Sequence, residues 1–419
     1  MSVTDNGGDK YVPRLVDAVL PEIIDSLPAV RLVGARSTGK TTSASQVAAS
    51  VVHLDREAEA AAFRIDPDAA LARLPRPTLL DEWQDVPGIL GAVKRAVDSN
   101  PAAGQFILTG SVRLELEGSW PGTGRVVRQA VHGLTQREIA EVTGNLFVER
   151  LHDDLLGLAD TPPTEWNLFD YLEAAARGGF PDLVLRRAGS VSRKRWLQGY
   201  LEDLLTIDVK LTGSNVDSSK LRTFVETLAI FSAQVVEQST MWDAAGISKQ
   251  TANVYEDLLE SVYFSERVPA LRSNRADRLV AMPKRYLLDT ALLMYILGVD
   301  ASQVRMDARL LGSILDTYVA MQLRPELAVQ PQPAKMLHLR SQSGRHEVDI
   351  VLEFPRGKVV GIEVKATAAP ALDDARHLIW MREVFGDDFI GGVVLHTGQS
   401  SFVLSPKIVA TPIAAIWTP

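Results

Sequence analysis

The stretch Gly34-Ala-Arg-Ser-Thr-Gly-Lys-Thr41 has the residue types and the spacing that bind nucleotide phosphates. It matches the pattern G-x-x-x-x-G-K-[ST] at every specified position. Glycine permits the torsions with which successive backbone N–H groups surround phosphate oxygens. Lys40 is expected to reach the β- and γ-phosphates of ATP, and Thr41 to coordinate Mg²⁺. The candidate nucleotide-binding residues are Gly34, Arg36, Ser37, Thr38, Gly39, Lys40, Thr41 and Thr42.

An acid pair follows the loop by about forty residues. Residues 77–82 have the pattern of a buried strand that ends in Asp81 and Glu82. Asp81 is expected to hold Mg²⁺, and Glu82 to polarise the attacking water. Such a strand is expected beside the strand that leads into the loop. The simpler alternatives are a glycine-rich turn that binds nothing and an exposed strand end.

The next predicted strand, residues 105–111, has a polar tip made by Thr109 and Ser111. Both are placed to contact a γ-phosphate or the water near it, although they can equally just end the strand. Further along, Arg125 lies in a glycine-rich loop and is a candidate to neutralise transition-state charge, as is Arg113, each from a neighbouring subunit. Spacing alone leaves the catalytic and the surface interpretation of Arg125 equally open.

These candidate residues need a framework that brings strand ends together. Apolar periodicity predicts a helix over residues 11–27 and a strand over 29–33, and then a helix over 43–50, a strand over 51–55 and helical structure over 56–73. Strands that alternate with helices indicate an α/β fold with a parallel sheet. A nucleotide then binds at the carboxyl ends of the strands.

A second set of candidate residues lies near the carboxyl terminus. Residues 347–354 and 358–365 alternate in polarity, and a Pro-Arg-Gly turn joins them, which predicts a β-hairpin. If Phe354 pairs with Lys358, Asp349 lies directly opposite Glu363. His396, on a later apolar strand, is interpreted as a core residue.

Opposed carboxylates with a lysine two residues on can hold a divalent cation and activate water for phosphodiester attack. A predicted helix over residues 310–323 adds one further acid. The alternative is an exposed hairpin that cross-strand Glu–Lys pairs stabilise. The candidate nuclease-like residues are Asp316, Asp349, Glu363 and Lys365.

The middle of the chain is predicted to be helical. Residues 153–164 read as a linker, and residues 221–264 as a small helical unit. Within it, a helix, a turn at Gly246 and a second helix capped by Ser248 suit a winged helix-turn-helix. The outward residues of the second helix would be Lys249, Gln250, Thr251 and Asn253. Its acids, Glu256, Asp257 and Glu260, would repel DNA, so a protein-packing role is the alternative.

Composition limits the class of protein. The chain has 419 residues, enough for two or three domains, and no cysteine, which excludes disulfides and thiolate chemistry. Its net charge of −8 gives no global attraction to nucleic acid. No apolar run reaches the roughly 20 residues of a membrane span, and residues 1–10 lack the apolar core of a signal peptide. We therefore expect a cytoplasmic protein without a membrane segment.

Several segments in a fixed order resemble a prokaryotic family of AAA-type ATPases fused to a carboxyl-terminal domain of uncharacterised function. In the amino-terminal part they are the phosphate loop, Tyr11-Val-Pro-Arg14, Leu54-Asp55, Leu80-Asp-Glu-Trp-Gln84, Val93-Lys-Arg-Ala-Val-Asp98, Leu108-Thr-Gly-Ser111 and Gly124-Arg125. The resemblance implies ATP binding and hydrolysis, with Asp81 and Glu82 in the second nucleotide motif. It also implies a sensing role for Thr109 and a trans-acting role for Arg125.

The carboxyl-terminal part resembles the same family in Gly246-Ile-Ser, Leu287-Leu-Asp289, Glu347-Val-Asp349 and Ile362-Glu-Val-Lys365. This implies a restriction-endonuclease-like fold, although the family usually has Glu at the place of Asp316. The expected domains are an ATPase over 1–150, a helical region with a winged-helix element over 165–270, and the nuclease-like domain over 271–419.

Two functions are compatible with these expectations. The first is a Mg²⁺-dependent ATPase that couples its nucleotide state to DNA binding or processing. The alternative is an ATP-switched module whose nuclease-like domain is catalytically silent and binds a protein partner. Either would suit a homo-oligomer.

Overall fold

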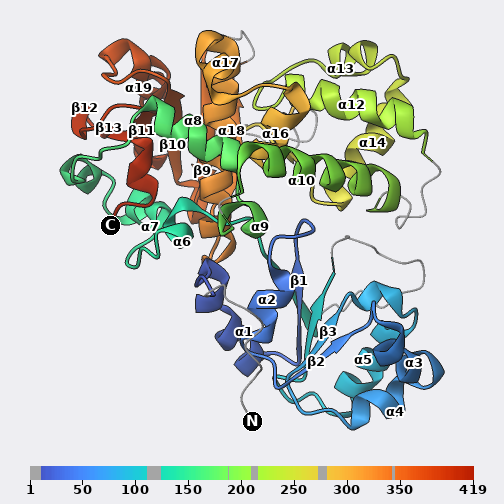
Figure 1. Ribbon diagram of the computed structural model, residues 1–419. Coiled ribbons are helices and arrows are strands. Elements are labelled where there is room, and N and C mark those ends of the chain that lie inside the picture. Colours follow the sequence, from blue (N-terminus) through green and yellow to red (C-terminus); the bar gives the residue numbers. More distant parts are fainter. Residues whose placement is uncertain (1–10, 111–123, 187, 209–215, 272–280, 342–344) are drawn as a thin grey trace.

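The computed structural model describes residues 11–110, 124–186, 188–208, 216–271, 281–341 and 345–419. Figure 1 shows an amino-terminal domain below and a larger body of helices and strands above it. Every helix in these ranges is too short or too polar to cross a lipid bilayer.

The amino-terminal domain is built on a parallel sheet in the order β2-β3-β4-β1-β5. This confirms the predicted α/β fold. The three central strands, β3, β4 and β1, are buried on both faces: Val30 and Leu32 of β1 pack on one side and Ala29 on the other. The strands are β1 (Ala29–Val33), β2 (Ser50–His53), β3 (Thr78–Asp81), β4 (Phe106–Thr109) and β5 (Val126–Ala130).

The strand order corrects one expectation. The acid-bearing strand β3 does not lie beside the loop strand β1, because β4 pairs with both and separates them. In this register Asp81 is the neighbour of Thr109, and Thr109 is the neighbour of Leu32. The polar tip of β4 is therefore placed between the acid pair and the phosphate loop.

Helices cover both faces of this sheet (Figure 1). The predicted helix over 11–27 is divided into η1 and α1, and the one over 56–73 is divided where Asp66 caps α4 and Pro67 begins it. The helix after the loop is short, because the chain enters β2 at Ser50. The helices are η1 (Leu15–Ala18), α1 (Leu20–Ser26), α2 (Lys40–Ser45), α3 (Glu57–Ile65), α4 (Pro67–Ala72), η2 (Trp83–Asp85) and α5 (Ile89–Ser99).

The middle region is helical, as predicted. Between α13 and α14 the chain turns at Gly246, whose φ is +64°, and the Ser248 hydroxyl accepts a hydrogen bond from the Thr251 N–H at 3.2 Å. On α14, Tyr255 is buried, whereas Val254 is 48% exposed. The helices are α6 (Gln136–Ile139), α7 (Phe147–Asp153), α8 (Leu168–Arg177), α9 (Pro181–Val184), α10 (Ser190–Asp203), α12 (Ser218–Ile230), α13 (Gln238–Ala244) and α14 (Lys249–Ser261).

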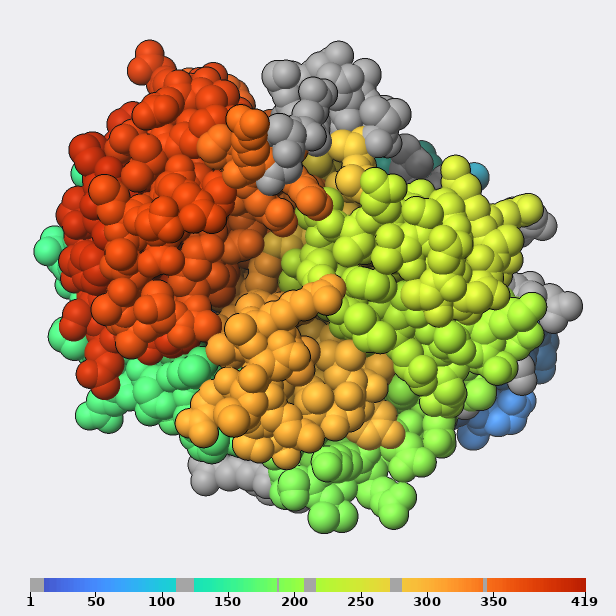
Figure 2. Space-filling model, turned by 90° about the horizontal axis from the view of Figure 1, so that it is seen from above, coloured from blue at the N-terminus to red at the C-terminus, as the bar shows by residue number. Residues whose placement is uncertain are grey.

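The middle region continues beyond residue 271. The strand β6 (Ser265–Val268) pairs antiparallel with β7 (Lys284–Leu287), so the two strands of one small sheet lie on opposite sides of the expected boundary. The helices α16 (Thr290–Leu297) and α17 (Ala301–Met306) then pack against α8. Figure 2 shows residues around 300, in orange, at the surface between the yellow-green helices and the red carboxyl-terminal part.

The segment expected to be a linker is part of the carboxyl-terminal body. The turn η3 (Leu156–Asp160) packs on the last strands of the chain, and Leu158 is fully buried. The Thr164 N–H donates to the Gln399 carbonyl at 3.0 Å. One hydrophobic cluster runs from Phe147 to Trp417, so the middle and carboxyl-terminal regions share a core.

The carboxyl-terminal sheet has six strands in the order β12-β13-β11-β10-β9-β8. The predicted hairpin forms with the predicted register: Val359 pairs with Glu353 and Ile362 with Ile350. The Phe354 N–H donates to the Lys358 carbonyl at 2.7 Å. The strands are β8 (Lys335–Arg340), β9 (Glu347–Glu353), β10 (Val359–Lys365), β11 (Phe389–His396), β12 (Phe402–Ser405) and β13 (Ile408–Pro412).

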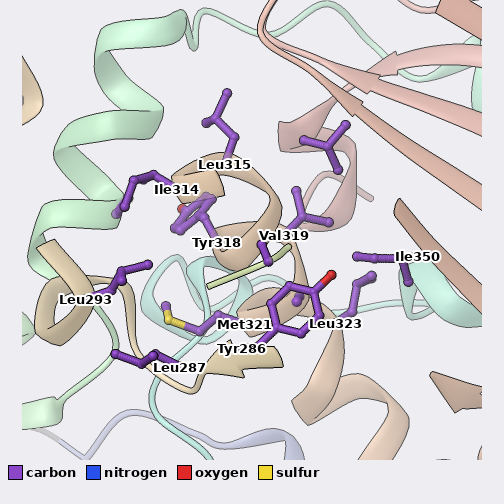
Figure 3. Packing of buried hydrophobic residues seen from close by; sticks show 14 of the residues in the cluster. Tyr286, Leu287, Leu293, Ile314, Leu315, Tyr318, Val319, Met321, Leu323 and Ile350 are labelled. Carbon is purple, nitrogen blue, oxygen red and sulfur yellow. The ribbon is translucent and has the colours of Figure 1, made fainter. Parts of the chain in front are cut away.

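Two helices contact this sheet, α18 (Ala308–Ala328) and α19 (Arg376–Phe385). Asp307 caps α18 by accepting hydrogen bonds from the N–H groups of the first turn. Figure 3 shows Ile314, Tyr318 and Leu323 of α18 packed among side chains of β7, α16 and β9. Because α18 is buried along most of its length, its polar residues must find partners inside the protein.

For two of these residues, Gln322 and Glu326, the partners lie on α6 and at the start of α7. The Gln322 amide oxygen accepts the Gln136 N–H at 2.8 Å, and Glu326 pairs with Arg137 at 3.2 Å. Glu326 also accepts the Val148 N–H at 3.0 Å, and burial raises its pKa to about 7. The helix α18 therefore joins the amino-terminal domain to the carboxyl-terminal sheet.

We expect the substitution Glu326→Ala to lower the free energy of unfolding by about 3–5 kcal/mol, because it leaves the Arg137 charge buried without its carboxylate. Urea denaturation followed by circular dichroism measures this. The double variant Arg137→Met/Glu326→Leu should recover most of the loss, since an apolar pair carries no desolvation cost. Glu383→Ala, at an exposed position of α19, is the matched control. A loss below about 1 kcal/mol would contradict the interpretation.

Candidate functional site

The phosphate loop follows β1 and is shaped by its glycines. Gly34 has a φ of +151°, and a Cβ there would lie 2.1 Å from the Val131 carbonyl oxygen. Gly39 has a φ of +90° and precedes α2. The Lys40 ammonium donates to the carbonyl oxygens of Gly34 at 3.0 Å and Ala35 at 2.7 Å, so it lies over the loop where phosphate oxygens would be bound.

Polar side chains from three segments converge on Asp81, which is buried at the end of β3. One carboxylate oxygen accepts hydrogen bonds from the hydroxyls of Thr41 at 2.7 Å and Thr109 at 2.6 Å. The other lies 3.0 Å from the His53 Nδ1. The Thr41 hydroxyl and the Asp81 carboxylate are adjacent oxygen donors, which is the ligand chemistry that Mg²⁺ prefers. These residues therefore fit a magnesium ion that also contacts bound phosphates.

His53 was missed by the sequence analysis, which noted only the carboxylate at the end of that strand. Its partner depends on strand order: β2 pairs with β3, and the register places His53 beside Asp81. Nothing in the spacing of the chain signals this contact. The histidine orients the Asp81 carboxylate from the side opposite Thr41.

Glu82 has the unusual backbone expected of a functional residue. Its φ of +49° and ψ of +49° lie in the left-handed region, where a non-glycine residue costs about 1–3 kcal/mol. Its carboxylate accepts a hydrogen bond from the Gln84 amide. Burial raises its pKa, and that makes it a better proton acceptor than an exposed glutamate.

Arg14 binds the phosphate loop, and the spacing of residues along the chain did not reveal this contact either. Its guanidinium donates to the Thr38 carbonyl at 2.9 Å, the His132 carbonyl at 2.7 Å and the Glu138 carboxylate at 3.1 Å. Tyr11, three residues earlier, donates to Asp17. The segment that carried part of the family resemblance thus ties the phosphate loop to α6.

The other predicted residues are placed as follows. Thr38 is buried, Arg36 is half-buried and Ser37 and Thr42 are exposed. Arg125 precedes β5 at the amino-terminal edge of the sheet, opposite the loop, and its exposed guanidinium pairs with Asp98. It is therefore not part of the site of its own chain. Ser111 and Arg113 lie outside the described residues.

The loop faces the middle region across a small pocket. Gly34, Ala35 and Thr38 line one side. The residues that line the other side come from beyond the sheet and include Phe180, Tyr200, Tyr263, Phe264 and Asp289. Asp289 caps α16 by accepting the Leu292 N–H and also accepts the Gly179 N–H. A nucleotide on the loop would be close to both regions.

The four candidate nuclease-like residues are also brought together. Asp349 accepts the Val364 N–H at 3.0 Å, and the Lys365 ammonium donates to Glu363 at 2.6 Å. Asp316 approaches from α18. Sequence analysis missed Lys284 of β7, whose ammonium forms an ion pair with Asp316.

This arrangement differs from the expected cation site. The Lys284 ammonium also lies 3.1 Å from the Asp349 carbonyl oxygen and 3.7 Å from its carboxylate. Within the described ranges, no group of three or more histidine, aspartate or glutamate side chains is arranged to hold a metal ion. These carboxylates therefore do not fit a divalent cation, because a lysine stands between two of them.

Three family models match the chain. An AAA domain matches residues 26–140, a domain of unknown function (DUF8612) matches 168–303, and another (DUF4143) matches 311–416. The AAA match contains the phosphate loop, so the amino-terminal domain is similar to AAA domains. The matched segments divide the rest of the chain between 303 and 311, at the start of α18, rather than at 271.

Among known proteins, the chain is similar to uncharacterized proteins of Mycobacterium tuberculosis and Mycobacterium bovis. Each is 27% identical over 407 residues, which cover 96% of this chain and 83% of the relative. Among solved structures it is similar to the Walker-type ATPase PABY2304 of Pyrococcus abyssi (15% identity, TM-score 0.41, 67% of this chain and 94% of that one). It is also similar to AMPPCP-bound DnaA from Aquifex aeolicus (12% identity, TM-score 0.23, 59% and 86%).

We expect Arg14→Met to weaken the affinity for a fluorescent ATP analogue about tenfold or more, because the Thr38 carbonyl of the loop and the His132 carbonyl each lose a charge-assisted hydrogen bond and Glu138 loses its ion pair. A fluorescence titration with Mg²⁺ present measures this. The exposed Arg73→Met in the same domain is the control. An affinity within about twofold of wild type would show that the tie to α6 does not support the loop.

Proposed function

We propose that the protein binds ATP with Mg²⁺ and hydrolyses it in its amino-terminal domain. The observation that carries this proposal is the convergence of the Thr41 and Thr109 hydroxyls on the Asp81 carboxylate, next to a complete phosphate loop with Lys40 over it. A merely structural glycine turn would not need a buried acid and two hydroxyls at this edge of the sheet.

Each residue has a role in this proposal. Lys40 binds the β- and γ-phosphates, and Thr41 and Asp81 hold Mg²⁺, which when bound neutralises charge on the phosphate oxygens. Glu82 accepts a proton from the attacking water. Thr109, between the acid strand and the loop strand, is placed to sense the γ-phosphate.

We propose further that nucleotide state reaches the carboxyl-terminal region through α6 and α18. The Thr38 carbonyl binds Arg14, and Arg14 binds Glu138 of α6. The neighbouring residues of α6 bind Gln322 and Glu326 of α18. A movement of the loop can therefore be passed to the buried helix α18 through contacts inside the protein.

The ATPase proposal predicts that Lys40→Ala loses nucleotide affinity, whereas Glu82→Gln keeps it and lowers turnover by about 100-fold or more, since only the second removes a proton acceptor. Phosphate release and analogue binding measure the two effects. Lys94→Ala and Glu22→Gln, at exposed positions of the same domain, are matched controls. Turnover by Lys40→Ala at the wild-type rate would refute the site.

The role of the carboxyl-terminal sheet belongs to the same proposal. We propose that it has a restriction-endonuclease-like fold, which the antiparallel β9–β10 hairpin followed by parallel β10–β11 pairing supports. With a lysine among its carboxylates, the alternative function is favoured: an ATP-switched interaction module with a catalytically silent nuclease-like domain. A protein partner would then bind with an affinity that differs between ATP and ADP.

A specific observation also supports DNA binding by a winged-helix element. Lys249, Gln250 and Asn253 of α14 are exposed. The acids that were expected to repel phosphates are neutralised within the protein: Arg267 binds Asp257 and Glu260, and Arg285 binds Glu256. The strands β6 and β7 follow α14 in the position of a wing.

If α14 contacts DNA, Lys249→Ala should weaken duplex binding and reduce the slope of log affinity against log salt by about one. Fluorescence anisotropy over a salt series measures both quantities, with ATP and with ADP. Lys220→Ala on α12, also exposed, is the control. If the protein does not bind duplex DNA, or if Lys249→Ala does not change that binding, the protein-interaction function is favoured.

A further inference from the structure

A fully buried lysine joins the two regions that share the large core. The side chain of Lys284 is 1% exposed, and that of its partner Asp316 is 7% exposed. A charged amine is almost never buried unless it is paired, because removal from water is costly. The buried ammonium of Lys284 is therefore stable only because oxygen atoms surround it.

The Lys284 ammonium is surrounded by oxygens from two other elements. It pairs with the Asp316 carboxylate of α18, and it contacts both the carbonyl and the carboxylate of Asp349 on β9. The Tyr286 hydroxyl donates to the second Asp316 oxygen at 2.9 Å, and the Val364 N–H donates to the second Asp349 oxygen. Each carboxylate thus has one oxygen toward the lysine and the other held by a neighbouring donor.

The third carboxylate belongs to the same cluster. Glu363 is 1% exposed, and one of its oxygens accepts from Lys365. The Glu363 carboxyl group also interacts with that of Asp349. Two ammonium groups therefore lie among three carboxyl groups, and burial raises the pKa of Glu363 well above its usual range.

The sequence of β7 explains how the lysine reaches this place. Side chains alternate along a strand, so Lys284 and Tyr286 point to one side and both bind Asp316. Arg285 points to the other side and pairs with Glu256 of α14. The strand β7 pairs with β6 and belongs to the middle region, not to the six-stranded sheet.

We propose that the Lys284 ammonium takes the place of a divalent cation, so that Lys284, Asp316 and Asp349 form a metal-independent clamp between the middle region and the carboxyl-terminal sheet. A cation bound by both carboxylates would have to lie about 2.0–2.6 Å from their oxygens, in the space that the ammonium fills. Its charge would also be repelled by that of the lysine. The clamp goes beyond the proposed ATPase activity and does not depend on nucleotide.

Thermal unfolding in EDTA and in millimolar Mn²⁺, without nucleotide, tests the clamp. Every protein in this experiment carries Asp81→Asn, which removes the metal ligand proposed in the amino-terminal domain. In the protein that carries only Asp81→Asn, Mn²⁺ should leave the melting temperature unchanged. Lys284→Ala should melt lower in EDTA and gain more than about 3 °C on adding Mn²⁺, because the vacated site can take a cation. Adding Asp349→Asn should abolish that gain.

Two results would overturn the clamp. One is a Mn²⁺-dependent rise of the melting temperature with Lys284 present that Asp349→Asn removes. The other is a folded Lys284→Ala protein with no response to Mn²⁺. If Lys284→Ala does not fold, titration of the Lys284-containing protein with Mn²⁺, followed by electron paramagnetic resonance beside its Asp349→Asn variant, still decides. Binding that depends on Asp349 refutes the clamp, and binding that is the same in both supports it.

Discussion

The structure depends on one constraint: most polar side chains of α18 are buried, and burial is costly for a polar group that finds no hydrogen-bond partner inside the protein. Asp316 finds its partners on β7, whereas Gln322 and Glu326 find theirs on α6 and α7. These partners come from regions far apart in the chain. The hydrogen bonds of the polar side chains of α18 therefore fix how the amino-terminal domain, the middle region and the carboxyl-terminal sheet are packed.

The phosphate loop has the same dependence on its surroundings. Its own residues supply the glycine torsions and Lys40, but the loop is held by Arg14 and shaped by the Val131 carbonyl that lies against Gly34. Arg14 and Val131 both connect the loop to the segment that continues into α6. The nucleotide site and the buried helix are thus built on the same few residues, which gives the proposed coupling a physical route.

The two clusters of carboxylates show how partners decide chemistry. Asp81 contacts two hydroxyls and an imidazole, and no lysine or arginine forms an ion pair with it among the described residues, which suits the cation proposed there. Asp316 and Asp349 face an ammonium group, so their charge is already balanced. Buried aspartates therefore differ in their capacity to bind a cation, because a buried charge is stabilised by whichever partner is nearest.

The sequence by itself determined the local features: the phosphate loop, the parallel α/β sheet, the acid pair after β3, the turn at Gly246 and the register that opposes Asp349 to Glu363. These follow from torsions, periodicity and short-range pairing, which act within a few residues. The tertiary structure alone decided that β4 separates β3 from β1, that His53 meets Asp81 and that Lys284 enters the second cluster. These depend on strand order and on contacts between distant segments, for which spacing along the chain carries no signal.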